Sequence, residues 1–106
     1  MTIDEKVEQL AQYLPSLRDV ADPATVQGIV QVWYTALDMS PWETFDQAKF
    51  KEGMDDITLI SHVNSSVECA LSLARIIHKY HGCNFDEQRI IILGLLHDVD
   101  KVVEYV

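Results

Sequence analysis

Lysine and arginine are scarce in this 106-residue sequence. Eight of them stand against 17 Asp and Glu, which gives a formal net charge of −9 and an isoelectric point near 4.6. Nucleic acids and anionic membranes are bound through clustered Lys and Arg, so the sequence predicts neither as a partner. The negative charge does not exclude an anionic substrate, because a bound divalent cation can reverse the local field.

Long apolar runs and cysteine pairs are also absent. The longest strongly apolar stretch, Ile90–Leu96, is much shorter than the ~18–20 residues that span a bilayer. The first residues, Met1–Lys6, have neither the basic start nor the apolar core of a secretory signal. Cys69 and Cys83 form no Cys-x-x-Cys pair, and we interpret both as packing or surface thiols. These absences predict a cytoplasmic protein in a reducing compartment.

Local signals predict an all-α protein. Apolar residues spaced three and four apart recur along the chain, and no segment alternates with a period of two. Thr2 with Glu5 predicts a capping box at the start of a first helix, which Pro15 ends. Asp22 followed by Pro23 places a cap before a proline at the first helical position and predicts a second helix.

Two further helices are predicted in the middle of the chain. Ser40–Glu43 places a cap, a proline and a glutamate in order, which predicts a short third helix that ends before Gly53. Asp55-Asp56 predicts the start of a longer helix that runs to about Tyr80, and Gly82 then ends it.

The last predicted helix, Arg89–Asp98, follows a capping pair of Asn84 and Glu87. Because this helix is apolar almost all round, we expect it at the centre of the bundle. The segment Lys101–Val106 is half apolar and has no capping glycine, proline or polar tail, so we expect the chain to be a fragment. We expect a homodimer or larger assembly that buries the exposed apolar surface of Ile90–Val106.

A His97-Asp98 doublet ends this apolar helix. Burying the two side chains is costly without a partner, and histidine and carboxylate are common ligands of Zn, Mn and Fe. Two antiparallel helices that meet near Gly82 and rise ~1.5 Å per residue place His62 about one turn from His97 in height. The sequence therefore predicts a divalent-metal site formed by His62, His97 and Asp98. The alternatives are a solvated His62 and a doublet that only caps its helix.

Three segments also resemble a known family: Leu59–Val63, Ala70–Ala74 and Gly94–Lys101. They are similar to the amino-terminal part of the HD superfamily of metal-dependent phosphohydrolases. The pattern of that family is a His, later a His-Asp doublet after an apolar helix, often a Lys three residues on, and finally a distant Asp. The doublet in its Leu-Leu-His-Asp-x-x-Lys setting is the specific part, and the resemblance covers about residues 56–106.

The resemblance implies an HD-domain-like helical bundle of five or six helices, incomplete at its C-terminus. Residues 1–54 would form its N-terminal helices and residues 55–106 its motif region. It also implies that His62, His97 and Asp98 bind a divalent ion (Mn, Fe, Zn, Mg, Ni or Co) that activates water to hydrolyse a nucleotide or another small phosphorylated metabolite. Asp98 would act in catalysis as well, and Lys101 would suit a phosphate oxygen unless it is merely a solvated lysine.

Two departures from the family pattern shape the alternatives. Asp100 stands where the family usually has a small residue, and nothing after it supplies the last Asp ligand. We therefore expect this 106-residue chain to lack hydrolase activity on its own. The alternatives are a non-catalytic HD-like regulatory or ligand-binding module, and a helical interaction domain in which the doublet is structural.

Other residues that could suggest a site receive structural interpretations. His78 and His81 lie in the last turn of the predicted long helix, where cationic side chains interact favourably with the helix dipole. Trp33 lies on the apolar stripe of its helix and is expected in the core. Trp42 and Phe45 are expected to form a small hydrophobic contact, with a pocket lining as the alternative.

Overall fold

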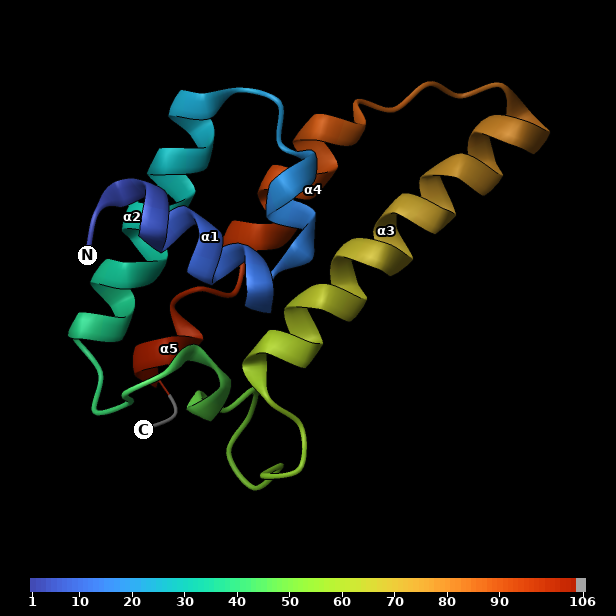
Figure 1. Ribbon diagram of the computed structural model, residues 1–106. Coiled ribbons are helices and arrows are strands. Elements are labelled where there is room, and N and C mark those ends of the chain that lie inside the picture. The colour runs from blue at the N-terminus through green and yellow to red at the C-terminus, as the bar shows by residue number, and fades with distance from the viewer. Residues whose placement is uncertain (105–106) are drawn as a thin grey trace.

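The computed structural model describes residues 1–104, and helices joined by loops make up its fold (Figure 1). Its elements are α1 (Ile3–Tyr13), the 3₁₀ turn η1 (Pro15–Asp19), α2 (Pro23–Asp38), the 3₁₀ turn η2 (Phe45–Gln47), α3 (Leu59–His81), α4 (Glu87–Leu96) and α5 (Lys101–Glu104). Lys49 and Thr58 form an isolated bridge, and the described residues contain no strand. The all-α prediction is confirmed. The predicted number of helices was wrong, because only four in residues 1–104 have ten or more residues and α5 is a single turn.

The predicted caps at the first two helices are present. Thr2 and Glu5 form the capping box of α1, and the chain turns into η1 at Pro15. The Asp22 carboxylate accepts a hydrogen bond from a backbone N–H in the first turn of α2. At the other end of α3, Gly82 adopts a left-handed conformation with φ of 70°, which favours glycine. These signals act within a few residues and need no tertiary contact.

The predicted third helix after Ser40 does not form. Residues 40–58 contain only the short turn η2, which Thr44 caps together with Gln47. Trp42 instead donates a hydrogen bond from its indole N–H to the Val102 carbonyl at 3.0 Å. Phe45 is buried against α1 and α2, in edge-to-face contact with Tyr13, Trp33 and Tyr34. The segment covers the core, and these tertiary contacts override its local helix signal.

The longest helix, α3, begins later than predicted. Thr58, not Asp55-Asp56, caps it by accepting a hydrogen bond from the Ser61 N–H at 3.1 Å. The preceding residues form a loop that the bridge between Lys49 and Thr58 closes. None of the helices in residues 1–104 combines the length and the apolar character that crossing a membrane requires.

The helix α4 is shifted two residues towards the N-terminus relative to the prediction. Asp86 caps it, so it ends at Leu96 and leaves the doublet outside its last regular turn. The expectation that this helix lies at the centre of the bundle was wrong. Only Ile91 and Leu95 are buried, and Leu93 points to the solvent. An apolar composition does not by itself surround a helix with neighbours.

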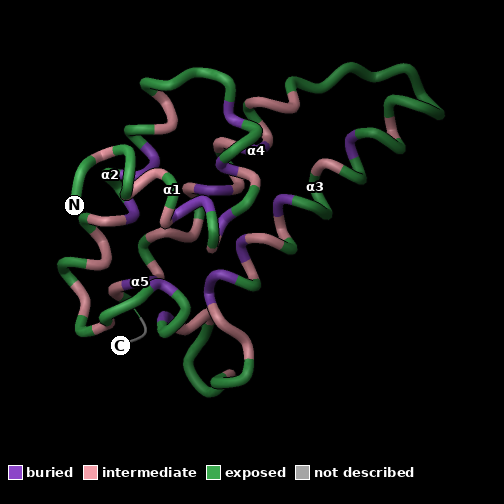
Figure 2. Tube along the Cα trace, in the orientation of Figure 1, coloured by how far each residue is buried: buried purple, intermediate pink, exposed green. Residues whose placement is uncertain are grey.

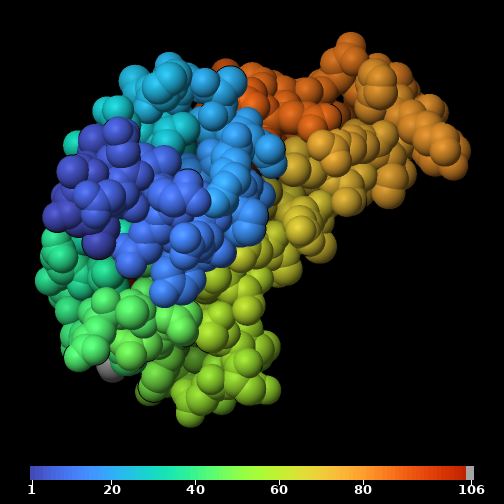
Figure 3. All heavy atoms as spheres, in the orientation of Figure 1, coloured from blue at the N-terminus to red at the C-terminus, as the bar shows by residue number. Residues whose placement is uncertain are grey.

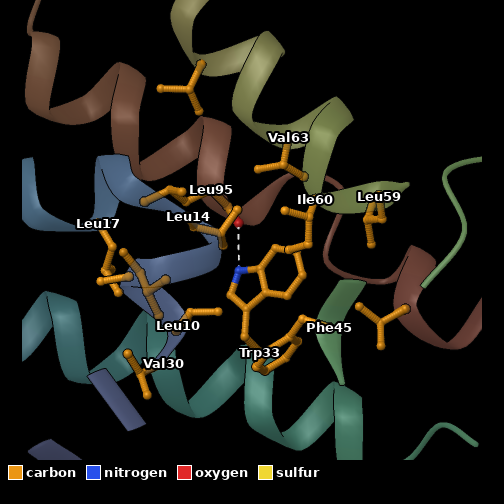
Figure 4. Close-up of a cluster of buried hydrophobic side chains, with 14 of the residues drawn as sticks. Leu10, Leu14, Leu17, Val30, Trp33, Phe45, Leu59, Ile60, Val63 and Leu95 are labelled. Atoms are coloured by element: carbon orange, nitrogen blue, oxygen red, sulfur yellow. Dashed lines mark hydrogen bonds between the residues drawn. The ribbon is translucent and has the colours of Figure 1, made fainter. Parts of the chain in front are cut away.

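The core lies between α1, α2, α3 and α4, around the fully buried Trp33 (Figure 4). The Trp33 indole N–H donates a hydrogen bond of 2.8 Å to the Leu95 carbonyl, which joins α2 to α4. The expectation that Trp33 belongs to the core is confirmed. The other fully buried large side chains around it are Leu10, Leu14, Leu17, Ile29, Val30, Phe45, Leu59, Val63, Val67, Leu95 and Val102.

Two amide side chains hold α3 and α4 against the N-terminal elements. Asn64 donates a hydrogen bond to the Tyr13 carbonyl at 2.8 Å, at the end of α1. Gln88 donates to the Asp19 carbonyl at 2.7 Å and accepts from the Ala21 N–H at 2.9 Å. These bonds attach the N-terminal parts of α3 and α4 to the N-terminal elements of the fold.

The described part of the chain is flat, with principal extents of 46 × 35 × 18 Å. Figure 1 shows that the second half of α3 and the loop before α4 extend away from the other helices. In Figure 2 most of this half of α3 is exposed. Because the molecule is thin, the other helices cover the N-terminal half of α3. They contact its C-terminal half on one face only.

The ion pair between Arg75 and Glu87, which joins α3 to α4, makes stability depend on pH. The hydrogen bond from Arg75, 2.6 Å long, lowers the pKa of Glu87 below its ordinary value of 4.5. A carboxylate with a lowered pKa stabilises the fold above that ordinary value and loses its effect as the pH falls from there through the lowered pKa. We expect Glu87→Gln to flatten the acid side of a plot of urea midpoint against pH, relative to the unmodified protein. Equal slopes for the two proteins would contradict this.

Candidate metal centre

His62 lies in the first turn of α3, where the Thr58 cap fixes the direction of the helix. Its backbone N–H donates to the Thr58 carbonyl at 3.1 Å. The imidazole ring stacks on Phe50 with 3.9 Å between the ring centroids and 26° between the ring planes. The loop before α3 therefore covers one face of the ring and orients its edge.

His97 and Asp98 lie where α4 ends. The antiparallel course of α3 and α4 brings this end next to the start of α3, as the predicted geometry required. The close approach of the two helices depends on Gly94, because a Cβ atom there would lie 2.6 Å from the Val67 Cγ2 atom. After His97 the chain leaves the helix in turns and enters α5.

The three side chains converge on one carboxylate oxygen. Asp98 Oδ2 lies 2.9 Å from His62 Nε2 and 2.9 Å from His97 Nε2. The side chain of Asp98 is 14% exposed, that of His62 27% and that of His97 46%. One ligand atom from each residue lies within 4.8 Å of the other two. The cluster is thus reachable from solvent on the His97 side.

The hydrogen bond at Nδ1 of His97 indicates which nitrogen of the neutral ring carries the proton. His97 Nδ1 lies 3.1 Å from the Gly94 carbonyl, which only accepts, so Nδ1 carries the proton. In a neutral ring Nε2 then presents a lone pair to the Asp98 oxygen. Two lone pairs at 2.9 Å repel, so this geometry calls for a proton or a metal ion between the two atoms.

A divalent ion fits the donor set. Two imidazoles and a carboxylate are ligands that Zn, Mn and Fe accept. At ~2.0–2.2 Å from an ion, neighbouring ligands of an octahedral sphere lie about 3 Å apart and opposite ligands about 4.2 Å apart. The spacing of 2.9 Å from Asp98 Oδ2 to each histidine nitrogen is close to that of neighbouring ligands. An N–H of a ligand histidine bonded to a backbone carbonyl is also a common orienting arrangement in metal sites.

Lys101 lies one turn beyond Asp98. Its backbone N–H donates to the Asp98 carbonyl at 3.0 Å, and its Nζ atom lies 3.9 Å from a Glu104 carboxylate oxygen. Its side chain is half-buried rather than freely solvated. Asp100 is exposed. Among residues 1–104 no fourth His, Cys, Asp or Glu joins the three-residue group.

Two residues of the site were not identified from the sequence. Phe50, which stacks on His62, lies in a loop where nothing in the local pattern marks it. Gly94 had a usable signal, because it is the only small residue in the apolar run Ile90–Leu96, and such a glycine often marks a close helix contact.

The other two histidines lie away from the cluster. His78 contacts the Cys83 carbonyl at 3.0 Å, near the far end of α3, and His81 is exposed in the last turn. Cys69 and Cys83 are both exposed free thiols, so the surface interpretation applies. No protein-family model, curated protein or solved structure matched the chain in the comparisons.

Proposed function

We propose that this protein is a metal-dependent phosphohydrolase of the HD type, acting on a nucleotide or another small phosphorylated metabolite. The observation that carries the proposal is the fixed orientation of His97. Its Nδ1 proton is engaged by the Gly94 carbonyl, so the lone pair of Nε2 points at the same oxygen that His62 contacts. The order of His62, the His97-Asp98 doublet and Lys101 supports it, since this order resembles the HD pattern.

The proposal gives each residue a role. His62, His97 and Asp98 would hold the divalent ion, and Phe50 keeps the His62 ring in place by stacking on it. When bound, such an ion lowers the pKa of a water ligand and offsets negative charge on phosphoryl oxygens. Lys101 would add a positive charge one turn from the doublet, where it suits a phosphate oxygen.

Metal binding is the first test. We expect the protein, after reconstitution with Mn²⁺, Co²⁺ or Zn²⁺, to retain about one or two ions, measured by elemental analysis after gel filtration. His62→Ala and His97→Ala should weaken binding by at least about 100-fold, because outer partners of metal ligands alone contribute 10–100-fold. Both changes lie at helix ends near the surface and should leave the helical circular dichroism unchanged.

Two other histidines provide the matched controls. His78→Ala and His81→Ala remove imidazoles from the far end of α3 and should leave the metal content unchanged. Equal metal in His97→Ala and in the unmodified protein would contradict the assignment. So would the absence of metal from the reconstituted protein, since the cluster would then be a hydrogen-bonded network only.

Turnover is measured separately on a panel of nucleotides and small phosphomonoesters. Hydrolysis that requires the added ion and disappears in Asp98→Asn would support the proposal and would overturn the expectation that the 106-residue chain is inactive on its own. Lys101→Ala should then raise KM while the metal content stays the same. A non-catalytic HD-like module is the second candidate. It is favoured by the three-residue ligand set of residues 1–104, and it predicts metal binding without hydrolysis of any ester.

A further inference from the structure

An apolar stripe runs along the outer face of α3. Cys69, Leu73, Ile76 and Tyr80, called the α3 seam below, are spaced four, three and four residues apart, which places them on one side of a helix. Leu73 is 58% exposed, Ile76 54% and Tyr80 70%, and Cys69 is exposed as well. A spacing of this kind is typical of helices that pair through a coiled-coil interface.

The rest of the described chain does not cover the α3 seam. The opposite face of α3, with Val63, Val67 and Ala74, packs on the core and α4. Figure 3 shows the seam's end of α3 and the following loop standing out from the molecular surface. Leu93, on the neighbouring helix α4, and Phe85, in the loop, add further exposed apolar side chains. The protruding half of α3 is therefore sterically accessible to another helix.

We propose that the α3 seam pairs antiparallel with the α3 seam of a second copy of this chain. The spacing of four, three and four reads the same in both directions, so a reversed helix aligns every seam residue with another. The twofold axis would pass between Leu73 and Ile76. Each Leu73 would then face Ile76 of the second copy, and each Cys69 would face Tyr80 of the second copy.

The sizes of the side chains favour this antiparallel alignment over a parallel one. It places the small Cys69 opposite the large Tyr80, so each layer holds a similar volume. A parallel pair would set Tyr80 against Tyr80 and Cys69 against Cys69, with crowding in one layer and a void in the other. The antiparallel pair also keeps the bulk of the two copies at opposite ends of the interface.

The exposed area of the seam suits a weak dimer. Leu73, Ile76 and Tyr80 are each more than half exposed. At roughly 150–250 Å² for a large side chain, these exposed fractions supply about 350 Å² per copy and about 700 Å² in total, which is in the range of weak, transient interfaces.

Electrostatic repulsion between two copies is small at this surface. The chain has a net charge of −9, yet α3 carries one carboxylate, Glu68, against the cations Arg75 and Lys79. Glu87 of α4 already pairs with Arg75. Pairing through this face of α3 therefore brings few acidic side chains of the two copies together.

Charge substitutions test the pairing and its register. Analytical ultracentrifugation should show a dimer at tens of micromolar, and Leu73→Glu or Ile76→Lys should each weaken dimerisation by at least about 30-fold, as expected for an interface hot spot. A mixture of the two variants should regain dimers, because Glu at position 73 then faces Lys at position 76 while the other central layer stays apolar. The matched control is Val32→Glu, an exposed aliphatic residue of α2, which should not change the association.

A disulfide tests the outer layers. In the Tyr80→Cys, Cys83→Ser protein the new cysteine would face Cys69 of the second copy, so mild oxidation should yield a covalent dimer. The Cys83→Ser protein alone should not cross-link, since its two Cys69 side chains lie in different layers. A monomer at these concentrations would overturn the proposal. So would a dimer that survives both charge variants, because its interface would then lie elsewhere. Neither outcome depends on whether the protein binds metal.

Discussion

Replacing Trp33 with alanine is expected to remove most of the stability of this fold. The side chain is completely buried and contacts Phe45 edge-to-face, with 5.9 Å between ring centroids. Emptying the volume of a buried tryptophan costs about 3–5 kcal/mol, and leaving the Leu95 carbonyl without its donor adds about 1–3 kcal/mol. Domains of this size are stable by only about 5–15 kcal/mol. Urea unfolding followed by circular dichroism should therefore show a midpoint close to zero denaturant.

A second substitution keeps part of the apolar contribution. Trp33→Phe retains much of the apolar volume and removes the indole N–H, so its cost combines a smaller cavity with the loss of the hydrogen bond that joins α2 to α4. We expect a loss of about 1–3 kcal/mol with an unchanged dependence on urea concentration. If Trp33→Phe were as stable as the unmodified protein, the bond to Leu95 would contribute nothing to stability.

Replacing Gly94 with alanine is expected to force α3 and α4 apart. The added Cβ would lie 2.6 Å from Val67 Cγ2, well inside van der Waals contact, and Val67 is completely buried. Overpacking of this kind costs about 1–3 kcal/mol. Because the Gly94 carbonyl also orients the His97 ring, the same change should weaken metal binding if the cluster is a metal site. Thermal unfolding and metal titration of one preparation measure both effects.

The double substitution shows whether the contact is the cause. Val67→Ala removes the Cγ2 atom that the new Cβ would meet and costs stability by leaving a cavity. In the Gly94→Ala, Val67→Ala protein the alanine methyl occupies part of that space, so the two losses should be less than additive. Strictly additive losses would mean that Gly94 acts through its backbone freedom and not through helix spacing.

Much of the fold follows from signals that act over a few residues. The Thr2 and Glu5 capping box, the Asp22 cap before Pro23 and the left-handed Gly82 each satisfy backbone groups locally, and each lies where the sequence predicted it. The inward position of Trp33 follows from helical periodicity for the same reason. Such features depend on neighbours along the chain, which the sequence displays directly.

The segment between α2 and α3 could not be predicted in this way. The signal at Ser40–Glu43 is a valid helix start, yet Trp42 bonds to the Val102 carbonyl and Phe45 fills the core next to Trp33. These partners lie far along the chain, and burying an aromatic ring outweighs the preference of one capping motif. The exposure of Leu93 was not predicted for a related reason, because an apolar sequence does not specify how many helices will pack around it.

The same distinction between local and tertiary signals applies to the candidate site. The residue types and the antiparallel reach of two helices were sufficient to predict from the sequence that His62, His97 and Asp98 could meet, because helix rise and turn position are regular quantities. Only the tertiary structure decided how they meet. The missing side chain of Gly94 sets the distance between α3 and α4, its carbonyl selects the nitrogen of His97 that faces Asp98, and Phe50 orients His62 from a loop. These are contacts between segments distant in sequence, whose spacing depends on how the whole chain packs.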